Sequence, residues 1–379
     1  MSRNECAQHA AARVLAHERG GNWRTHLARL RDSHPPDTPL RLLGTTPAQL
    51  ARVITMGSPG ARQSAGREGG NRGKRFSSGR GSCARMKVAV TGGTGYVGPA
   101  VVEELLRAGH DVVVLEHHHA APVGEHPRLS RAQGSVNDAR SLREAFAGCD
   151  AVVHLVAILR EDAKRHVTFE RVHLEGTRNV VDAAKGAGVE RFLLMSANGV
   201  ESGLHTPYFD TKREMERMVK EAGFAWTIFR PSYIAGDAEG GFDAIFADIV
   251  DKAPVLPSFA GGKFEIQPIA REDVAKAFVR ALATPESVGK AYTLVGPERM
   301  TWNDYLHRLA DVRNRKRIVA YVPGPIVVGA ARVAGRHFPA DPDQLRMLML
   351  GNTGDGSEAV RDFGLDLVAW DDAVSGLRR

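Results

Sequence analysis

The segment TGGTGYVG at residues 91–98 constrains the fold more than any other part of this sequence. It follows the apolar run KVAVTG and precedes a helical pattern that begins near Val97. Gly92 permits a tight turn off a strand, Gly95 lets backbone approach a pyrophosphate, and Gly98 lets helix and strand pack closely. The free N–H groups at the start of the helix then face the phosphates. The motif predicts a dinucleotide site formed by Gly92, Thr94, Gly95, Tyr96, Val97 and Gly98.

From Met86 onward, short β-rich runs alternate with helical periodicity, which is typical of a parallel sheet covered by helices. The helical segments 97–108 and 169–185 are followed by Gly109 and Gly186, where we expect left-handed C-terminal caps. We predict an α/β fold, a Rossmann-type doubly wound parallel sheet with a smaller C-terminal substrate or lid domain. The expected strands are KVAVTG (87–92), DVVVLE (111–116), AVVHLVAIL (151–159), RFLLMS (191–196) and WTIFRP (226–231).

The net charge of +7 is distributed unevenly along the chain. Residues 1–85 hold 15 Lys and Arg against 5 Asp and Glu, which leaves 36 against 39 for residues 86–379. The basic excess therefore lies in the front segment, and the balance argues against nucleic-acid binding by the folded part. Three cysteines in 379 residues are too few for a disulfide framework, which favours a reducing compartment. No apolar run reaches the roughly 18 residues that span a bilayer.

The chain divides into three predicted regions. Residues 1–85 form a basic extension, whose stretch 57–85 is a Gly, Ser and Arg mixture that cannot pack a core. Residues 86–230 form an NAD(P)-binding domain, and residues 231–379 a lid region with segments returning to the sheet. The extension is a disordered arm, an Arg-rich transit segment, or sequence upstream of a translation start at Met86, and we favour the last. A cytoplasmic location follows, with organelle targeting less favoured.

Glu116 ends the second expected strand, 24 positions after Gly92, near the offset of a ribose-binding carboxylate. A 2′-phosphate beside it would meet a like charge at about 4 Å, a repulsion on the order of 4 kcal/mol at an effective dielectric of 20. We therefore expect NAD(H) to be preferred, with NADP(H) as the alternative. The following residues, His117–His119, soften this repulsion when protonated, but side chains of consecutive residues point apart and predict no metal site.

Tyr208 and Lys212 are four positions apart in a predicted helix that begins at Pro207 and ends before Gly223, so they share one face. A phenol has a pKa near 10, and lowering it to about 7 takes roughly 4 kcal/mol of preferential phenolate stabilisation. A nearby ammonium and an oxidised nicotinamide ring could supply it. Tyr208 would then act as general acid or base toward a carbonyl or carbinol, while Lys212 also holds the nicotinamide ribose. The alternative is an exposed helical pair.

These residues carry a resemblance to the atypical or extended short-chain dehydrogenases/reductases, the NAD-dependent epimerase/dehydratase-like enzymes. The match covers essentially all of residues 86–300, and the DQLRMLMLGN stretch at 343–352 most resembles the branch of the NAD(P)H-binding accessory subunit of respiratory complex I. The motifs that carry it are TGGTGYVG (91–98), VVHLVA (152–157), FERVHLEGTRNVVDAAKGAGVERFLLMS (169–196), Tyr208 with Lys212, FRPSYIAG (229–236) and QPIAREDVAKAF (267–278).

The resemblance implies a role for several residues. Tyr208 would be the acid/base with Lys212 as its electrostatic partner, and Ser196 or Asn198 would orient the substrate carbonyl. Lining the cofactor would be Val156, Ala157 and the backbone of Pro231.

The sequence also departs from the family pattern. In GSVND (134–138), Ser135 with Val136 stands where many members place an adenine-contacting Asp, and His173 stands where active members often keep an Asn. Only eleven residues separate Ser196 from Tyr208, which shortens the loop that shapes a substrate pocket. These departures bear on catalysis more than on cofactor binding.

Two functions from different classes follow. The first is an NAD(P)(H)-dependent oxidoreductase or epimerase-like enzyme acting on an unidentified carbonyl or alcohol. The second is a non-catalytic dinucleotide-binding subunit or assembly factor of a complex I-like electron-transport system. Such a protein would lie at the surface of the inner membrane and associate peripherally with respiratory or membrane proteins. The apolar run at 321–335 fits contact with a membrane or partner, but its Pro and Gly residues favour a helix packed inside the protein.

Overall fold

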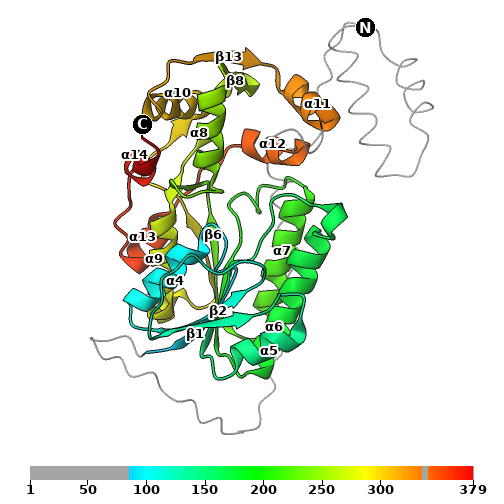
Figure 1. Cartoon of the computed structure of the whole chain (residues 1–379), viewed down its shortest axis with the longest axis vertical. Helices are drawn as coiled ribbons and strands as arrows, with labels where there is room; N and C mark the ends of the chain where they lie inside the picture. Colours follow the sequence, from blue (N-terminus) through cyan, green and yellow to red (C-terminus); the bar gives the residue numbers. More distant parts are fainter. Residues whose placement is uncertain (1–84, 335–339, 379) are drawn as a thin grey trace, which may run out of the picture. The chain divides into compact units, whose positions relative to one another are not determined.

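A seven-stranded parallel sheet lies at the centre of the computed structural model, which describes residues 85–334 and 340–378 (Figure 1). The strand order is β11-β6-β5-β4-β1-β2-β3, so the chain reverses direction across the sheet between β1 and β4. The strands are β1 (Lys87–Thr91), β2 (Asp111–Glu116), β3 (Leu129–Gln133), β4 (Ala151–His154), β5 (Arg191–Met195), β6 (Ala225–Pro231) and β11 (Lys290–Leu294). This arrangement confirms the predicted Rossmann-like α/β fold.

The central strands are Val-rich and fully buried, as expected of a sheet covered on both faces. β4 ends at His154, so the predicted strand through residue 159 is too long. Leu155 still donates its N–H to the Thr91 carbonyl, after which the chain leaves the sheet beside the glycine loop. The strands β3 and β11 were not predicted. β3, with sequence LSRAQ, is a half-exposed edge strand and lacks an apolar run.

Helices cover both faces of the sheet (Figure 1). One core packs beneath α4 (Gly98–Arg107), α9 (Arg271–Leu282) and α13 (Ser357–Phe363). The other packs beneath α5 (Ala139–Phe146), α6 (Gly176–Gly186) and α7 (Pro207–Glu221). Gly109 has φ +89°, as predicted for a left-handed cap. The cap predicted at Gly186 is wrong, because α6 continues through that residue and Gly188 takes the positive φ of +72°.

A third core, centred on Trp302, Tyr305 and Trp370, builds the smaller domain from the chain after β6. Its strands form three pairs: β7 (Ile234–Ala235) with β10 (Ile269–Ala270), β9 (Glu265–Ile266) with β12 (Met300–Thr301), and β8 (Val255–Phe259) with β13 (Ile318–Val322). Its helices are α8 (Phe242–Lys252), α10 (Trp302–Val312), α11 (Gly324–Ala334), α12 (Pro342–Met349) and α14 (Trp370–Ala373). Short helical turns occur along the whole described chain: η1 (Ala163–Arg165), η2 (Glu170–Glu175), η3 (Ala260–Gly262), η4 (Pro285–Ser287) and η6 (Ser375–Leu377).

The predictions for the front extension fall on residues 1–84, which lie outside the described residues. Across residues 85–334 and 340–378, every helix is too short or too polar to cross a bilayer.

Candidate dinucleotide and catalytic site

The glycine loop has the geometry of a phosphate cradle. Gly92 has φ +80°, and a Cβ on Gly98 would lie 2.3 Å from the Gly92 carbonyl oxygen. A Cβ on Gly95 would meet only that oxygen, at 3.3 Å, so the space outside the loop is open. No side chain caps α4 at Val97, which leaves the first helical N–H groups aimed at this space. The loop therefore fits the pyrophosphate of a dinucleotide through backbone alone.

A buried polar chain supports the loop from beneath, and sequence reasoning missed it. His154 lies 2.6 Å from the Thr91 hydroxyl through Nδ1 and 3.1 Å from the Thr177 hydroxyl through Nε2. Burial, with a smaller contribution from Lys212, lowers the pKa of His154 to about 3, so the ring is neutral. The chain joins β1, β4 and α6 at the point where the sheet reverses direction. Its one sequence signal is a polar residue inside the apolar run VVHLVA.

Tyr96 belongs to the glycine loop, but its side chain packs against the smaller domain. A Cβ on Gly241 would lie 2.4 Å from the Tyr96 ring, and the Arg271 guanidinium lies 5.6 Å from the ring centroid. The Tyr96 hydroxyl is buried without a hydrogen-bond partner, and burial raises its pKa. Only the backbone of Tyr96 is therefore placed to contact phosphate.

Glu116 lies at the carboxyl end of β2, as predicted, but only 2% of its surface is exposed. Its carboxylate accepts hydrogen bonds from the Ala121 N–H at 2.9 Å and from Arg131 Nη1 at 2.5 Å. A longer bond of 3.3 Å comes from Gln133. Arg131 also donates to the Val123 carbonyl at 2.6 Å, so the group folds the loop after β2 back onto the strand. Contact between Glu116 and a ribose stays a prediction.

Ser135 and Val136 follow β3 at the same edge of the sheet. The Ser135 hydroxyl accepts the Asn137 N–H at 3.2 Å, and the Val136 carbonyl accepts Asn179 Nδ2 at 3.0 Å. The adjacent Asn137 Oδ1 is buried without a partner. These polar atoms of the GSVND segment lie together after β3, and their contact with adenine stays a prediction.

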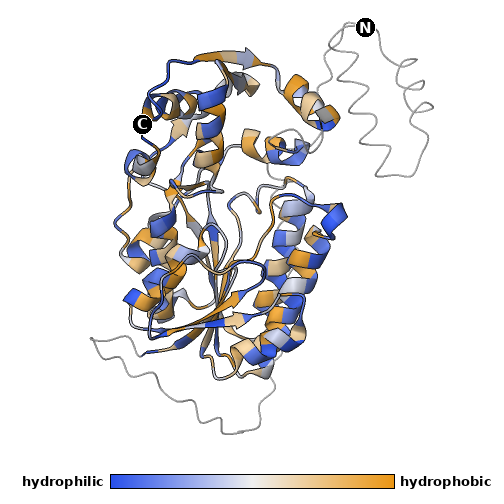
Figure 2. Ribbon diagram, in the orientation of Figure 1, coloured by the Kyte–Doolittle hydropathy of each residue, from blue (hydrophilic) through white to orange (hydrophobic). Residues whose placement is uncertain are grey.

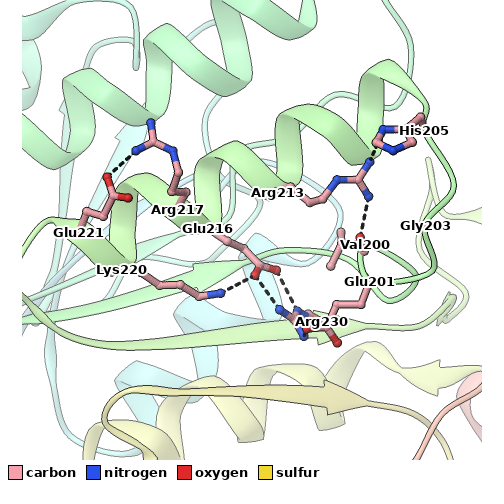
Figure 3. Close-up of a pocket in the computed structure, with 10 residues that line it drawn as sticks. All are labelled: Val200, Glu201, Gly203, His205, Arg213, Glu216, Arg217, Lys220, Glu221 and Arg230. Atoms are coloured by element: carbon pink, nitrogen blue, oxygen red, sulfur yellow. Dashed lines mark hydrogen bonds and ion pairs between the residues drawn. The ribbon is translucent and has the colours of Figure 1, made fainter. Parts of the chain in front are cut away.

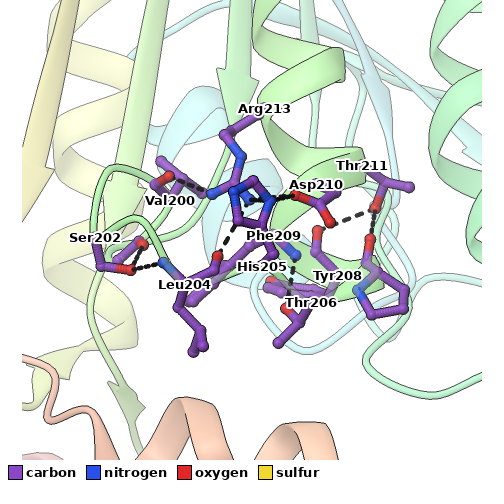
Figure 4. Close-up of polar contacts among 12 residues, drawn as sticks. Val200, Ser202, Leu204, His205, Thr206, Tyr208, Phe209, Asp210, Thr211 and Arg213 are labelled. Atoms are coloured by element: carbon purple, nitrogen blue, oxygen red, sulfur yellow. Dashed lines mark hydrogen bonds and ion pairs between the residues drawn. The ribbon is translucent and has the colours of Figure 1, made fainter. Parts of the chain in front are cut away.

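Tyr208 and Lys212 come together on the first turns of α7. Figure 4 shows Tyr208 at the start of this helix, with Thr206 and Thr211. Lys212 Nζ lies 5.9 Å from the centroid of the Tyr208 ring and donates to the Met195 carbonyl at 2.9 Å. Burial lowers the pKa of Lys212 to about 7. Burial also raises the pKa of Tyr208, opposite to the lowering expected from the sequence. In the protein alone, Tyr208 is therefore a neutral phenol, suited to donating a proton.

His173 ties the helix that carries Tyr208 to the loop after β4. His173 Nε2 accepts the Ile158 N–H at 2.9 Å, so Nδ1 carries the proton and donates to the Thr211 hydroxyl at 2.9 Å. Burial, then Lys212, lowers the pKa of His173 to about 3. His173 lies in η2, where the helix widens to a π-helical turn, and its ring centroid is 5.8 Å from that of Tyr208. Sequence reasoning found this position only as a departure from the family pattern.

Of the two candidates for orienting a carbonyl, only Asn198 has a protein partner. The Ser196 hydroxyl is buried without a hydrogen-bond partner among the described residues. Burial would raise the pKa of nearby Glu216, but the hydrogen bonds from Arg230 lower it. Asn198 Nδ2 donates to Asn352 Oδ1 at 3.1 Å and to the Thr353 carbonyl at 3.0 Å.

The remaining predicted cofactor contacts lie where strands of the sheet end. The backbone N of Val156 would be 3.0 Å from a Cβ on Gly92, and exposed Ala157 follows it. Pro231 ends β6 and accepts the Asn198 N–H at 2.9 Å.

A charged cavity of about 640 Å³ lies along the other side of α7, and its lining contains none of the predicted site residues (Figure 3). At its floor Arg230 of β6 makes a two-pronged ion pair with Glu216, at 2.9 and 2.7 Å. Both side chains are buried. The pair anchors α7 to the sheet one helical turn beyond Lys212, and so positions that helix.

Comparisons with known proteins agree with this geometry. A family model described as NAD(P)H-binding matches residues 92–285, just over half of the chain. The chain belongs to this NAD(P)H-binding family. Its glycine loop, Lys212 and Tyr208 all lie inside the matched region.

Among curated relatives of this NAD(P)H-binding protein, mouse "NADH dehydrogenase [ubiquinone] 1 alpha subcomplex subunit 9, mitochondrial" is 28% identical over 270 residues, covering 70% of each chain. Sterol demethylase protein B of Methylococcus capsulatus is 28% identical over 327 residues, covering 75% of this chain and 98% of its own. A Thermotoga maritima UDP-glucose 4-epimerase structure aligns with TM-score 0.61 and 19% identity, covering 77% of this chain and 96% of the epimerase. These relatives confirm the family resemblance. The family model confirms NAD(P)(H) as the cofactor.

Proposed function

We propose that this chain is an NAD(P)(H)-dependent oxidoreductase or epimerase-like enzyme that exchanges hydride at a carbonyl or carbinol carbon. The observation that carries the proposal is the Tyr208 ring beside Lys212 at the edge of the sheet that also carries the glycine loop. The curated relatives, which include one named 3-beta-hydroxysteroid dehydrogenase, 36% identical over 123 residues, support a redox reaction.

The residues suggest how a proton would move. The bound dinucleotide supplies hydride chemistry at its nicotinamide ring. As a carbonyl carbon gains hydride, its oxygen takes the phenol proton of Tyr208, which burial keeps protonated. The resulting phenolate is stabilised by Lys212, whose pKa of about 7 lets it hold or release a proton near neutrality. His173 holds the helix through Thr211 and stays neutral.

Tyr208→Phe tests this function. We expect turnover in a carbonyl and alcohol screen, followed by the absorbance of the reduced cofactor, to fall roughly 100-fold or more, because general acid catalysis contributes at least that much. Cofactor affinity should stay unchanged. Tyr321→Phe, at an exposed position of β13, is the matched control and should retain full turnover. Turnover that survives Tyr208→Phe would remove this residue from the mechanism.

A second function is favoured by a specific observation: Asn198, one of the two groups that would polarise a carbonyl, is hydrogen-bonded within the protein to Asn352. In that case the chain is a dinucleotide-binding subunit or assembly factor of an electron-transport system, peripheral to the inner membrane. Support comes from the relatives named as NADH dehydrogenase subunits. NADH at a hundredfold excess over its dissociation constant would then stabilise the fold by about 2.7 kcal/mol without turnover. Co-purification with respiratory proteins and no turnover of any substrate would distinguish this function from the first.

A further inference from the structure

Apolar side chains are exposed along one end of the smaller domain, on β13 and α11. Ile318 and Tyr321 of β13 are 68% and 65% exposed, and Ile326 and Val333 of α11 are 61% and 91% exposed. The two elements follow one another at the end of the molecule farthest from the central sheet (Figure 1), and both are coloured as largely hydrophobic in Figure 2. Neighbouring strand β8 adds exposed Val255.

Helix α11 is apolar on two faces, and only one of them is covered. Val327 and Ala331 are buried in the core that contains Leu345 of α12. Ile326 and Val333 lie on a face directed to solvent, together with Ala330. A helix with this pattern has a second apolar face, which no other described part of the chain covers. The helix expected to pack inside the protein at 321–335 therefore packs on one face only, and its other face is exposed.

The exposed apolar residues are accompanied by cations and no acids. Residues 312–340 contain six Lys and Arg and no Asp or Glu, a local excess that the balanced charge of residues 86–379 conceals. Arg313 and Arg317 are bound to the end of α8. Lys316, just before β13, and Arg332, near the end of α11, are exposed, and neither side chain makes an ion pair with another described residue.

We propose that β13 and α11 form a docking surface for an anionic lipid bilayer. Ile326 and Val333 would enter the boundary between headgroups and acyl chains, while Lys316 and Arg332 meet anionic headgroups. An aromatic residue with a polar tip, such as Tyr321, suits the same depth. A second copy of this chain fits less well, because Lys316 and Arg332, exposed without ion-pair partners among the described residues, would repel their equivalents in the other copy. The proposal deepens the peripheral location given above, and it involves none of the residues assigned to chemistry.

The test uses the full chain with vesicles of phosphatidylcholine alone or with about 30 mol% phosphatidylglycerol. We expect wild type to sediment with the anionic vesicles only, and less at high salt. Lys316→Gln with Arg332→Gln should weaken that binding about 30-fold, since each surface cation contributes about a factor of five. Ile326→Ser with Val333→Ser should abolish it. The matched control, Lys185→Gln with Val288→Ser, changes an exposed cation and an exposed apolar residue elsewhere and should bind as wild type does.

Dinucleotide binding and turnover of each variant, measured in solution without vesicles, separate this proposal from the proposed function, because both should equal the wild-type values. Several outcomes would overturn it: no sedimentation of wild type, binding that ignores phosphatidylglycerol, or equal losses in the control. Self-association that disappears in Ile326→Ser with Val333→Ser would assign the surface to a second copy instead.

Discussion

The glycine loop and the region around Tyr208 lie at the same edge of the sheet, yet they are built in different ways. The loop is one continuous segment, residues 92–98, that offers backbone N–H groups and needs no side chain to be charged. The region around Tyr208 combines side chains from η2, α7 and the end of β5 with segments near residue 352. A site made of backbone depends on local conformation, whereas a site made of side chains depends on how distant segments pack.

The two regions also differ in electrostatics. Close to Tyr208, burial lowers the pKa of Lys212 to about 7 and the pKa of His173 to about 3. Beneath the glycine loop, burial likewise lowers the pKa of His154 to about 3. Shifted pKa values of this kind cluster at functional sites. The region around Tyr208 thus holds a lysine that exchanges its proton near neutrality, whereas the phosphate end rests on a histidine that stays neutral there.

Glu216→Gln, on the helix that carries Tyr208, should have the largest effect of the four substitutions. It removes the buried carboxylate from Arg230, which then keeps only the exposed carboxylate of Glu201 at 2.6 Å, so we expect the free energy of unfolding to fall by about 3 kcal/mol in urea titrations. Glu221→Gln breaks only the exposed pair with Arg217 and should change stability by less than about 0.5 kcal/mol. Equal effects of the two substitutions would show that the pair beneath α7 does not anchor it.

Gly98→Ala should damage the phosphate end alone. The added Cβ would lie 2.3 Å from the Gly92 oxygen, and relieving an overlap of this kind costs about 2 kcal/mol, which corresponds to about a 30-fold loss of dinucleotide affinity by calorimetry. Gly186→Ala is the matched control, because a Cβ there meets nothing within 4 Å. Unchanged affinity in Gly98→Ala would contradict the assignment of the loop.

Lys212→Met should alter the pH dependence of stability. The pKa of Lys212 is about 7 when folded and near 10.5 when unfolded, so the unfolded chain binds the extra proton and stability is lost as pH falls toward 7. Between pH 9 and pH 7 this costs wild type about 2 kcal/mol, a slope that Lys212→Met should lack. Lys185→Met, at an exposed lysine, should keep the wild-type slope. Parallel curves for all three proteins would place the Lys212 pKa near its ordinary value.

Glu116→Ala should have the smallest effect. We expect the ratio of NADP(H) to NAD(H) affinity to rise about fivefold, on the order of 1 kcal/mol, because Arg131 already offsets part of the repulsion on a 2′-phosphate. Glu125→Ala removes an exposed acid 3.6 Å from the same arginine and should leave the ratio unchanged. A ratio unaffected by Glu116→Ala would remove this residue from cofactor selection.

The sequence alone predicted the glycine loop, the parallel sheet and the Tyr208–Lys212 pair, because each depends on the spacing of residues close together in the chain. It did not reach β3, whose polar edge sequence lacks an apolar alternation, or the true end of β4 at His154. It also missed the bonds of His154, the anchoring of Arg230 and the partners of Asn198, since these join residues 23, 14 and 154 positions apart.

The amino-acid sequence by itself determined the class of fold and the conformation of the glycine loop, because glycine spacing and strand periodicity act over a few residues. Only the tertiary structure decided the protonation and the hydrogen bonding of the side chains at the site. Whether Tyr208 is a neutral phenol, whether Asn198 and Glu116 are hydrogen-bonded and which face of α11 stays exposed all follow from burial and from partners distant in the chain. Desolvation and long-range hydrogen bonds depend on how distant segments pack, and the spacing of neighbouring residues does not specify that packing.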